Sequence, residues 1–147
     1  MDQLSESEVN ELFLTGSTIG SYILFPSNRI DRKPTINGAR GINHKIADRF
    51  DLTLECIRRH YLQEDSPLAT TLRRYASFFD LFDSFKGYVD FFLLQDLVAD
   101  DYGAIRFYLP FNEFKNSPLP RNLSEYRTYR NGVLEFIHSR NRRIDNR

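Results

Sequence analysis

The clearest pattern in the sequence is a row of apolar residues at every third or fourth position between residues 42 and 61. A helix places residues with this spacing on one face, which can then pack against a core. Asn43 precedes most of the row and is a suitable N-cap. The pattern predicts one amphipathic helix over this range. The apolar face consists of Ile42, Ile46, Phe50, Leu54, Ile57 and Tyr61.

Two further segments repeat the helical spacing. Ser66-Pro67 is typical of a helix start, and the helix that follows is expected to stop by Lys86-Gly87, with glycine just beyond its last turn. Its apolar side consists of Leu68, Leu72, Tyr75, Phe79 and Phe82. A last helix is predicted over residues 124–142. Its inward side consists of Tyr126, Tyr129, Val133, Phe136 and Ile137.

The first residues are acidic and only weakly periodic. Residues 2–14 fit either a short amphipathic helix or a poorly ordered lead-in, with Leu4, Val9, Leu12 and Phe13 as the apolar side if the segment docks.

Strands are expected in the remaining apolar segments. Residues 21–25 predict a strand that ends at Pro26, while residues 26–43 fit an irregular loop or two short strands. The run at 88–98 is compatible with a strand or a short helix, and we favour a hairpin with residues 104–109. We therefore expect a single α+β domain over residues 1–147, with three main helices on a small, mostly antiparallel sheet. Residues 1–15 would form an acidic lead-in, and 140–147 a flexible basic tail.

Composition narrows the class of protein. Of the 147 residues, 41% are hydrophobic, and 20 basic side chains balance 20 acidic ones, so the net charge is zero. Neutrality argues against general adhesion to nucleic acid. No apolar run reaches the ~20 residues that span a bilayer. The single cysteine, Cys56, excludes an internal disulfide and fits a reducing cytoplasm. We expect a cytoplasmic protein with no membrane contact.

The neutral total conceals blocks of charge. Residues 1–13 carry four acids and no base, whereas residues 14–60 and 121–147 each carry a net charge of +4. Most of the basic residues are arginine, whose planar fork suits carboxylates, phosphates and aromatic faces. These blocks fit either ion pairs inside the folded protein or a selective anionic partner.

One flank of the predicted 42–61 helix has the side chains best suited to binding an anion. Arg49 and His60 lie along it, and Arg40 precedes it in a glycine-rich loop, so the three could converge on an anion. Backbone N–H groups near Asn37 could donate further hydrogen bonds to the same anion. In the alternative interpretation, these side chains border the core and form local hydrogen bonds. Arg29, on the same side of an extended chain as Asp31, is either a ligand contact or half of a salt bridge.

The end of the chain is the other candidate region. Arg140, Arg142 and Arg143 could neutralise phosphates or an acidic protein. The alternative is that they stabilise the C-terminus of the last helix through its dipole.

Other chemistry has weaker support in the sequence. The three histidines lack metal-ligand spacing, so we expect no metal and no cofactor. Cys56 and His60, four residues apart, make an unusual dyad, and an inert buried thiol is the simpler interpretation. Asp90 and Asp96 flank an apolar run that could raise the pKa of a general acid, although both fit exposed positions better.

Several stretches together resemble an uncharacterised bacterial family, a domain of unknown function. They are residues 25–31 (FPSNRID), 35–41 (TINGARG), 46–61 (IADRFDLTLECIRRHY), 91–98 (FFLLQDLV) and 140–144 (RNRRI). The resemblance covers about residues 17–144 and lacks the longer N-terminal portion typical of the family. It implies a bacterial or bacteriophage protein of the cytoplasm and supplies no activity.

The preferred hypothesis is a small accessory protein that binds a macromolecular partner, with another protein favoured as that partner, and modulates an enzyme that handles nucleic acid. Arginine and aromatic residues are enriched at such interfaces. One alternative is an enzyme or sensor for a phosphate-bearing small molecule that uses Arg29, Arg40, Arg49 and His60. A second alternative is direct binding of nucleic acid by the arginine-rich C-terminal helix.

Overall fold

A computed structural model describes residues 5–16 and 18–146, and every regular element in these ranges is helical. The order is α1 (Glu6–Gly16), the 3-10 turn η1 (Ile19–Ser21), α2 (Ile36–Ile42), α3 (Phe50–Tyr61), α4 (Ala69–Arg74), α5 (Ala76–Asp80), α6 (Phe85–Phe92), the 3-10 turn η2 (Gln95–Leu97) and α7 (Leu123–Asp145).

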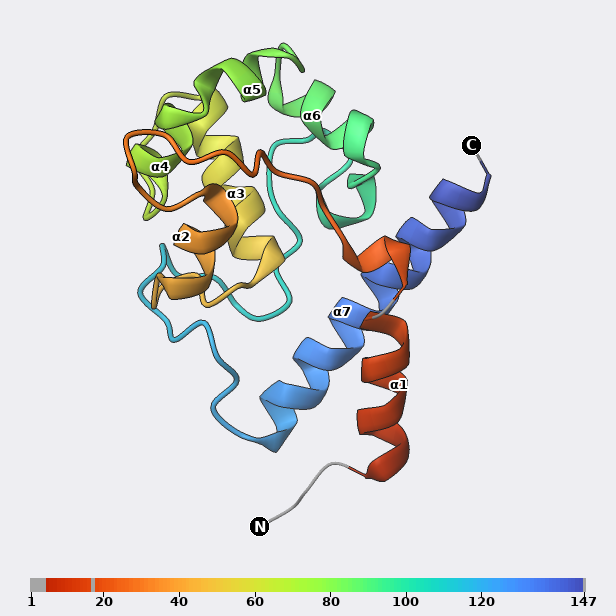
Figure 1. Ribbon diagram of the computed structural model, residues 1–147. Helices are drawn as coiled ribbons and strands as arrows, with labels where there is room; N and C mark the ends of the chain where they lie inside the picture. Colours follow the sequence, from red (N-terminus) through yellow and green to blue (C-terminus); the bar gives the residue numbers. More distant parts are fainter. Residues whose placement is uncertain (1–4, 17, 147) are drawn as a thin grey trace.

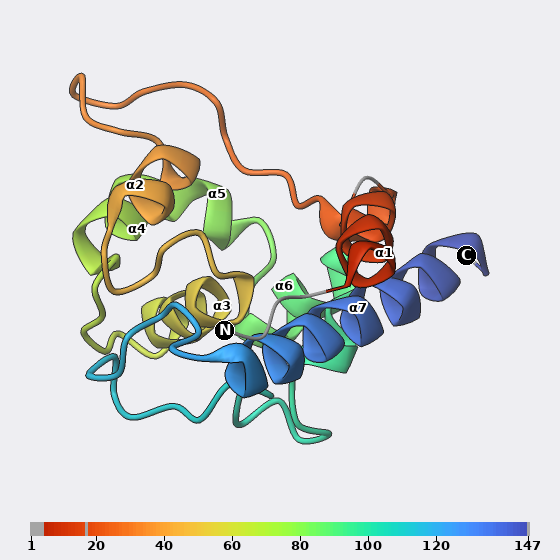
Figure 2. The same cartoon turned by 90° about the horizontal axis from the view of Figure 1, so that it is seen from below.

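Helix α3 lies at the centre of the fold (Figure 1). Helices α4, α5 and α6 curve around one side of it, and α2 lies beside α4. The long helix α7 crosses the other side, and α1 packs along α7 away from the core (Figure 2). The core side chains come from every helix between α2 and α7, and the largest fully buried ones include Tyr88, Phe79, Ile36 and Leu54.

The predicted sheet is absent from the described residues, so the α+β prediction was wrong. Residues 22–35 form an extended strap between η1 and α2, and no strand pairs with it. The expected hairpin is reduced to one antiparallel bridge between Val98 and Ile105. Residues 88–92 belong to α6, which ends where Leu93 takes a left-handed conformation with φ 57°.

The single helix predicted over 42–61 is two helices joined by a turn. Asn43 caps the C-terminus of α2 instead of starting a helix, and Ile42 is 77% exposed. Ala47 and Asp48 have positive φ values of 47° and 64°, which no α-helix tolerates. Ile46 is nevertheless fully buried from within this turn, so the apolar spacing continues across a break in the helix.

Residues 35–42, expected to be irregular, begin a helix because Thr35 caps it by accepting a hydrogen bond from the Gly38 N–H. The helix predicted after Ser66-Pro67 is broken at Tyr75 into α4 and α5. Gly87 does not end it. It lies in the first turn of α6, where its N–H bonds to the Ser84 cap.

The last predicted helix is confirmed, and α7 extends further than expected, from Leu123 to Asp145. Asn122 caps it through the Glu125 N–H. The expected flexible tail is therefore helical as far as residue 145. Helix α1 occupies most of the acidic lead-in, and its expected apolar side at Leu4, Val9, Leu12 and Phe13 lies outside what the structure describes.

Candidate functional site

Arg49 was predicted to bind an anion, but it forms a buried ion pair inside the protein. Its Nε donates to Asp51 Oδ1 at 3.0 Å, and Nη2 donates to Oδ2 of the same carboxylate. Asp51 also accepts the backbone N–H of Tyr108 at 2.9 Å, and Arg49 Nη1 donates to the Pro118 carbonyl at 3.0 Å. The pair thus connects α3 to the 107–118 loop. Asp51 is fully buried although it is charged.

Arg40, Arg49 and His60 do not converge. Arg40 donates to Thr53 Oγ1 at 3.0 Å and pairs with Asp48 at 3.1 Å, near the start of α3. His60 lies near the other end of α3. At 1.5 Å per residue it is roughly 16 Å along the helix axis from Arg49 and roughly 10 Å from Thr53, which Arg40 contacts. The predicted anion site of these three side chains is therefore wrong.

His60 packs among aromatic rings, with its ring centroid 5.0 Å from that of Phe79. Burial lowers the pKa of His60. One turn earlier, burial raises the pKa of the Cys56 thiol to about 12. A thiol with this pKa remains protonated at neutral pH, so the inert interpretation of Cys56 is the one that the surroundings support.

Arg29 and Asn37 have separate local roles. The Arg29 guanidinium donates to the carbonyls of Arg32 at 2.8 Å and Lys33 at 3.3 Å, instead of pairing with Asp31. Asn37 is exposed in the first turn of α2. The two side chains belong to different elements and share no contact in the structure.

The positive charges of α7 are largely neutralised within the protein. Arg143 pairs with Asp96 at 2.6 Å, Arg127 with Glu8 at 3.3 Å and Arg130 with Glu11 at 2.6 Å. Among the described residues, the Arg142 side chain donates only to Ser139. Arg140 is buried. This internal pairing removes most of the charge that direct nucleic-acid binding by α7 would use.

Two of the residues predicted to bind a ligand or partner lie at the same cavity. Arg40, from α2, and Arg140, from α7, both line a cavity of about 320 Å³ between α7, the start of α3 and residues 20–25. Sequence reasoning assigned them to different hypotheses, and nothing in their spacing of 100 positions indicates that they meet.

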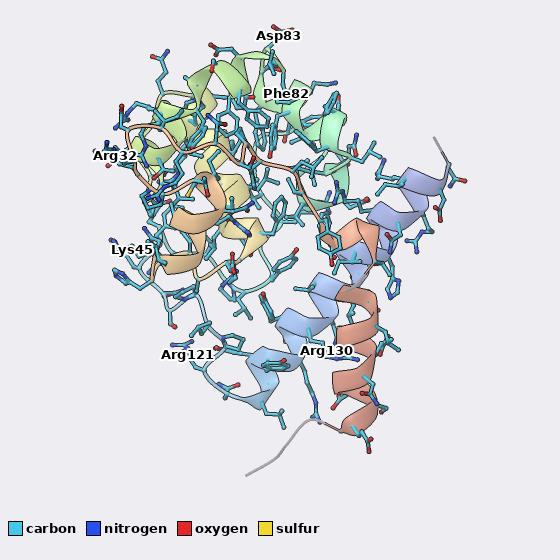
Figure 3. All side chains as sticks on the ribbon, in the orientation of Figure 1. Arg32, Lys45, Phe82, Asp83, Arg121 and Arg130 are labelled. Atoms are coloured by element: carbon cyan, nitrogen blue, oxygen red, sulfur yellow. The ribbon has the colours of Figure 1, made fainter. Side chains whose placement is uncertain are left out.

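Five cations of the strap and α4 lack a carboxylate partner among the described residues. Arg29, Arg32, Lys33, Arg73 and Arg74, here called the basic surface, form no ion pair with any carboxylate in the described ranges. Arg74 Nη2 donates to the Pro34 carbonyl at 3.3 Å, which joins the strap to α4. Arg32 projects at the edge of the molecule (Figure 3). Of these residues only Arg29 was predicted to contact a ligand, although residues 29–33 contain two arginines and a lysine.

Asp90 is not a general acid with a raised pKa. Its carboxylate accepts from Lys86 Nζ at 2.7 Å, Tyr102 OH at 2.6 Å and Gln95 Nε2 at 3.2 Å. The hydrogen bond from Lys86, followed by that from Tyr102, holds the pKa of Asp90 below its usual value. Within the described ranges, no group of three or more His, Cys, Asp or Glu side chains is placed to hold a metal ion.

Tyr88 presents an unusual polar group in the core. It is fully buried, and its hydroxyl has no hydrogen-bond partner among the described residues. An unpaired buried hydroxyl costs about 1–3 kcal/mol. We expect Tyr88→Phe to raise the free energy of unfolding by about 1 kcal/mol, measured by urea denaturation.

Tyr61→Phe is the matched control for this prediction. The Tyr61 hydroxyl donates to the Phe79 carbonyl at 2.6 Å, so its removal should lower stability by about 1 kcal/mol. A loss of stability in both variants would show that the Tyr88 hydroxyl has a partner.

Comparison with known proteins places this helical fold in a family. The model of DUF6994, a family of unknown function, matches residues 1–144. The chain belongs to the DUF6994 family. The match begins at residue 1, whereas the resemblance noted in the sequence began near residue 17. No curated protein and no solved structure matches this DUF6994 chain. Across the part that the structure describes, no helix is both long enough and apolar enough to span a bilayer.

Proposed function

We propose that this protein is a binding protein that recognises an acidic segment of a partner protein through its basic surface. The observation that carries the proposal is the contrast between this surface and the arginines of α3 and α7 that form ion pairs. Arg58 and Arg59 on α3 have carboxylate partners, as do three arginines of α7. Arg29, Arg32, Lys33, Arg73 and Arg74 have none among the described residues. An acidic partner would supply the missing carboxylates.

The tip of the strap is held in one shape before any partner binds. Asp31 and Arg32 have φ values of 55° and 59°, a left-handed conformation that side chains rarely adopt. The Arg29 guanidinium stabilises this turn by binding the carbonyls of Arg32 and Lys33. A preorganised loop loses less conformational entropy on binding, which favours affinity.

A protein partner is favoured over nucleic acid for two reasons. The whole chain is neutral, and carboxylates of α1 and η2 pair with three arginines of the long helix α7, so this helix does not offer an extended basic face to a phosphate backbone. The strap also exposes Tyr22 and Leu24, and aromatic side chains are enriched at protein interfaces.

Charge reversal at the tip tests the proposal. Arg32 and Lys33 are exposed, and their side chains make no hydrogen bond within the described ranges, so Arg32→Glu/Lys33→Glu should fold normally. We expect this variant to bind a labelled peptide of glutamate and leucine at least about tenfold more weakly than the wild type, measured by fluorescence anisotropy. The wild-type affinity should fall as salt is added.

Lys115→Glu/Arg142→Glu makes the same change in charge elsewhere on the surface and should leave the affinity within about twofold, because both residues are exposed and lack ion pairs with described carboxylates. Equal losses in the two double variants would overturn the proposal. So would tighter binding of a DNA duplex than of the peptide at the same salt, which would identify the partner as nucleic acid.

A further inference from the structure

The cavity between Arg40 and Arg140 has the character of a small-molecule site. Its volume of about 320 Å³ lies within the range of ligand pockets. Aromatic and apolar side chains, including Phe50, Phe136 and Val133, form part of the wall, while Tyr108 and Tyr129 add phenol groups. The basic surface lies elsewhere, on the strap and α4, so this site is independent of the proposed function.

Arg140 brings an unbalanced positive charge to this cavity. Its side chain is only 7% exposed. It donates to the carbonyls of Phe92 at 3.0 Å, Gly20 at 3.2 Å and Tyr22, and no carboxylate of the described residues pairs with it. Burial lowers the pKa of Arg140, but arginine stays protonated in proteins. A buried charge without a counter-ion is costly, and an anion in the cavity would relieve that cost.

Arg40 is already balanced. It pairs with Asp48 at 3.1 Å, and its other donors reach Thr53 Oγ1 and the Asp48 carbonyl. The cavity therefore has two arginines and one carboxylate, which leaves one net positive charge.

Arg140 also has a donor to spare. The three carbonyls take Nε and Nη1, and Nη2 has no hydrogen-bond partner among the described residues. A carboxylate oxygen is a suitable acceptor for this group, and charge-assisted hydrogen bonds of this kind are about twice as strong as neutral ones. The aromatic side chains of the cavity would at the same time shield an apolar group of the ligand from water.

We propose that this cavity binds a monocarboxylate carrying an aromatic or branched apolar group. A single negative charge matches the single unbalanced positive charge, and the apolar walls match the body of such a ligand. A phosphate dianion would exceed the available charge and would leave the walls without a partner.

The test uses 3-phenylpropionate as the probe, with its neutral amide and inorganic phosphate for comparison. We expect the carboxylate to raise the melting temperature and to bind measurably in calorimetry, whereas the amide and phosphate should bind at least about tenfold more weakly. Equal binding of carboxylate and amide would overturn the proposal, because the site would then not recognise the charge. Absence of carboxylate binding to the wild type would overturn it as well.

Two variants locate the site. Val133→Phe adds bulk to the cavity wall without touching either arginine, and we expect it to weaken the probe at least about tenfold. Arg140→Lys keeps the charge and loses the guanidinium fork, with a similar expected loss. Arg142→Lys is the control on the solvent side of α7 and should bind like the wild type. If Arg140→Lys fails to fold, Val133→Phe decides, and unchanged binding in that variant overturns the assignment.

Discussion

Replacing Asp51 by alanine is expected to lower the free energy of unfolding by about 3–5 kcal/mol, the largest single effect predicted for this protein. The carboxylate is fully buried and neutralises Arg49, which is itself only 5% exposed. Without Asp51, the guanidinium stays in the interior with the Pro118 carbonyl as its one hydrogen-bond acceptor among the described residues. The Tyr108 N–H loses its partner as well. Urea denaturation followed by circular dichroism measures the change.

Asp48→Ala is the matched control. Asp48 also pairs with an arginine, Arg40, but its side chain is 69% exposed, so its loss should cost about 1 kcal/mol or less. Similar losses in the two variants would show that the Arg49–Asp51 pair does not stabilise the fold as the structure indicates.

Replacing both Arg49 and Asp51 distinguishes the effect of an unpaired buried charge from the effect of altered packing. In the double variant Arg49→Met/Asp51→Leu, no unpaired charge remains in the interior. A buried ion pair replaced by apolar residues of similar volume is often neutral or stabilising. We therefore expect the double variant to be more stable than Asp51→Ala. A double variant as unstable as the single one would indicate that packing, and not charge, dominates at this site.

The sequence predicts helices best where one helix spans the whole apolar pattern. Helix α7 satisfies this condition. The pattern at 42–61 does not, because Ile46 enters the core from a turn in which Ala47 and Asp48 are left-handed. Neither residue is glycine, so no local signal marks the break. The spacing of apolar residues indicates which side chains are buried. It does not indicate whether one unbroken helix connects them.

The strand predicted at 21–25 fails for a different reason. Its alternation is real, since Tyr22 and Leu24 are exposed while Ile23 and Phe25 pack against the core. No second strand lies beside it in the described part of the chain, and its local environment includes the Arg140 side chain, which binds the Tyr22 carbonyl across 118 positions. Alternation predicts an extended backbone, but a sheet requires a partner that the local sequence cannot specify.

Which arginines are available to a ligand also depends on contacts between residues that are far apart in the sequence. Arg130 meets Glu11 across 119 positions, and Arg143 meets Asp96 across 47. Each such pair decides whether an arginine is neutralised or available to a ligand. The sequence indicates an excess of arginine in three regions, but only the folded chain separates the paired arginines on α7 from the unpaired basic surface.

Gly87→Ala is the second prediction with a large effect, and its sign opposes helix propensity. Asp83, with φ 68°, turns the chain so that the Phe82 carbonyl lies over the first turn of α6. A Cβ atom at residue 87 would lie 2.0 Å from that carbonyl oxygen, a contact with backbone that no side-chain rotation can relieve. We expect a loss of about 3 kcal/mol, the upper part of the range for overpacking, although alanine alone favours a helix by about 1 kcal/mol.

The control for Gly87→Ala is the same substitution at Gly16, the last residue of α1. A Cβ atom there would meet nothing within 4 Å, so Gly16→Ala should leave stability unchanged or raise it by up to about 1 kcal/mol. Thermal and urea denaturation of both variants compare the two effects directly. If Gly87→Ala were as stable as Gly16→Ala, the turn at 82–84 would have to move away from α6. Because Tyr88 and Val89 follow Gly87 into the core, such a movement should also change the near-ultraviolet dichroism of the aromatic cluster.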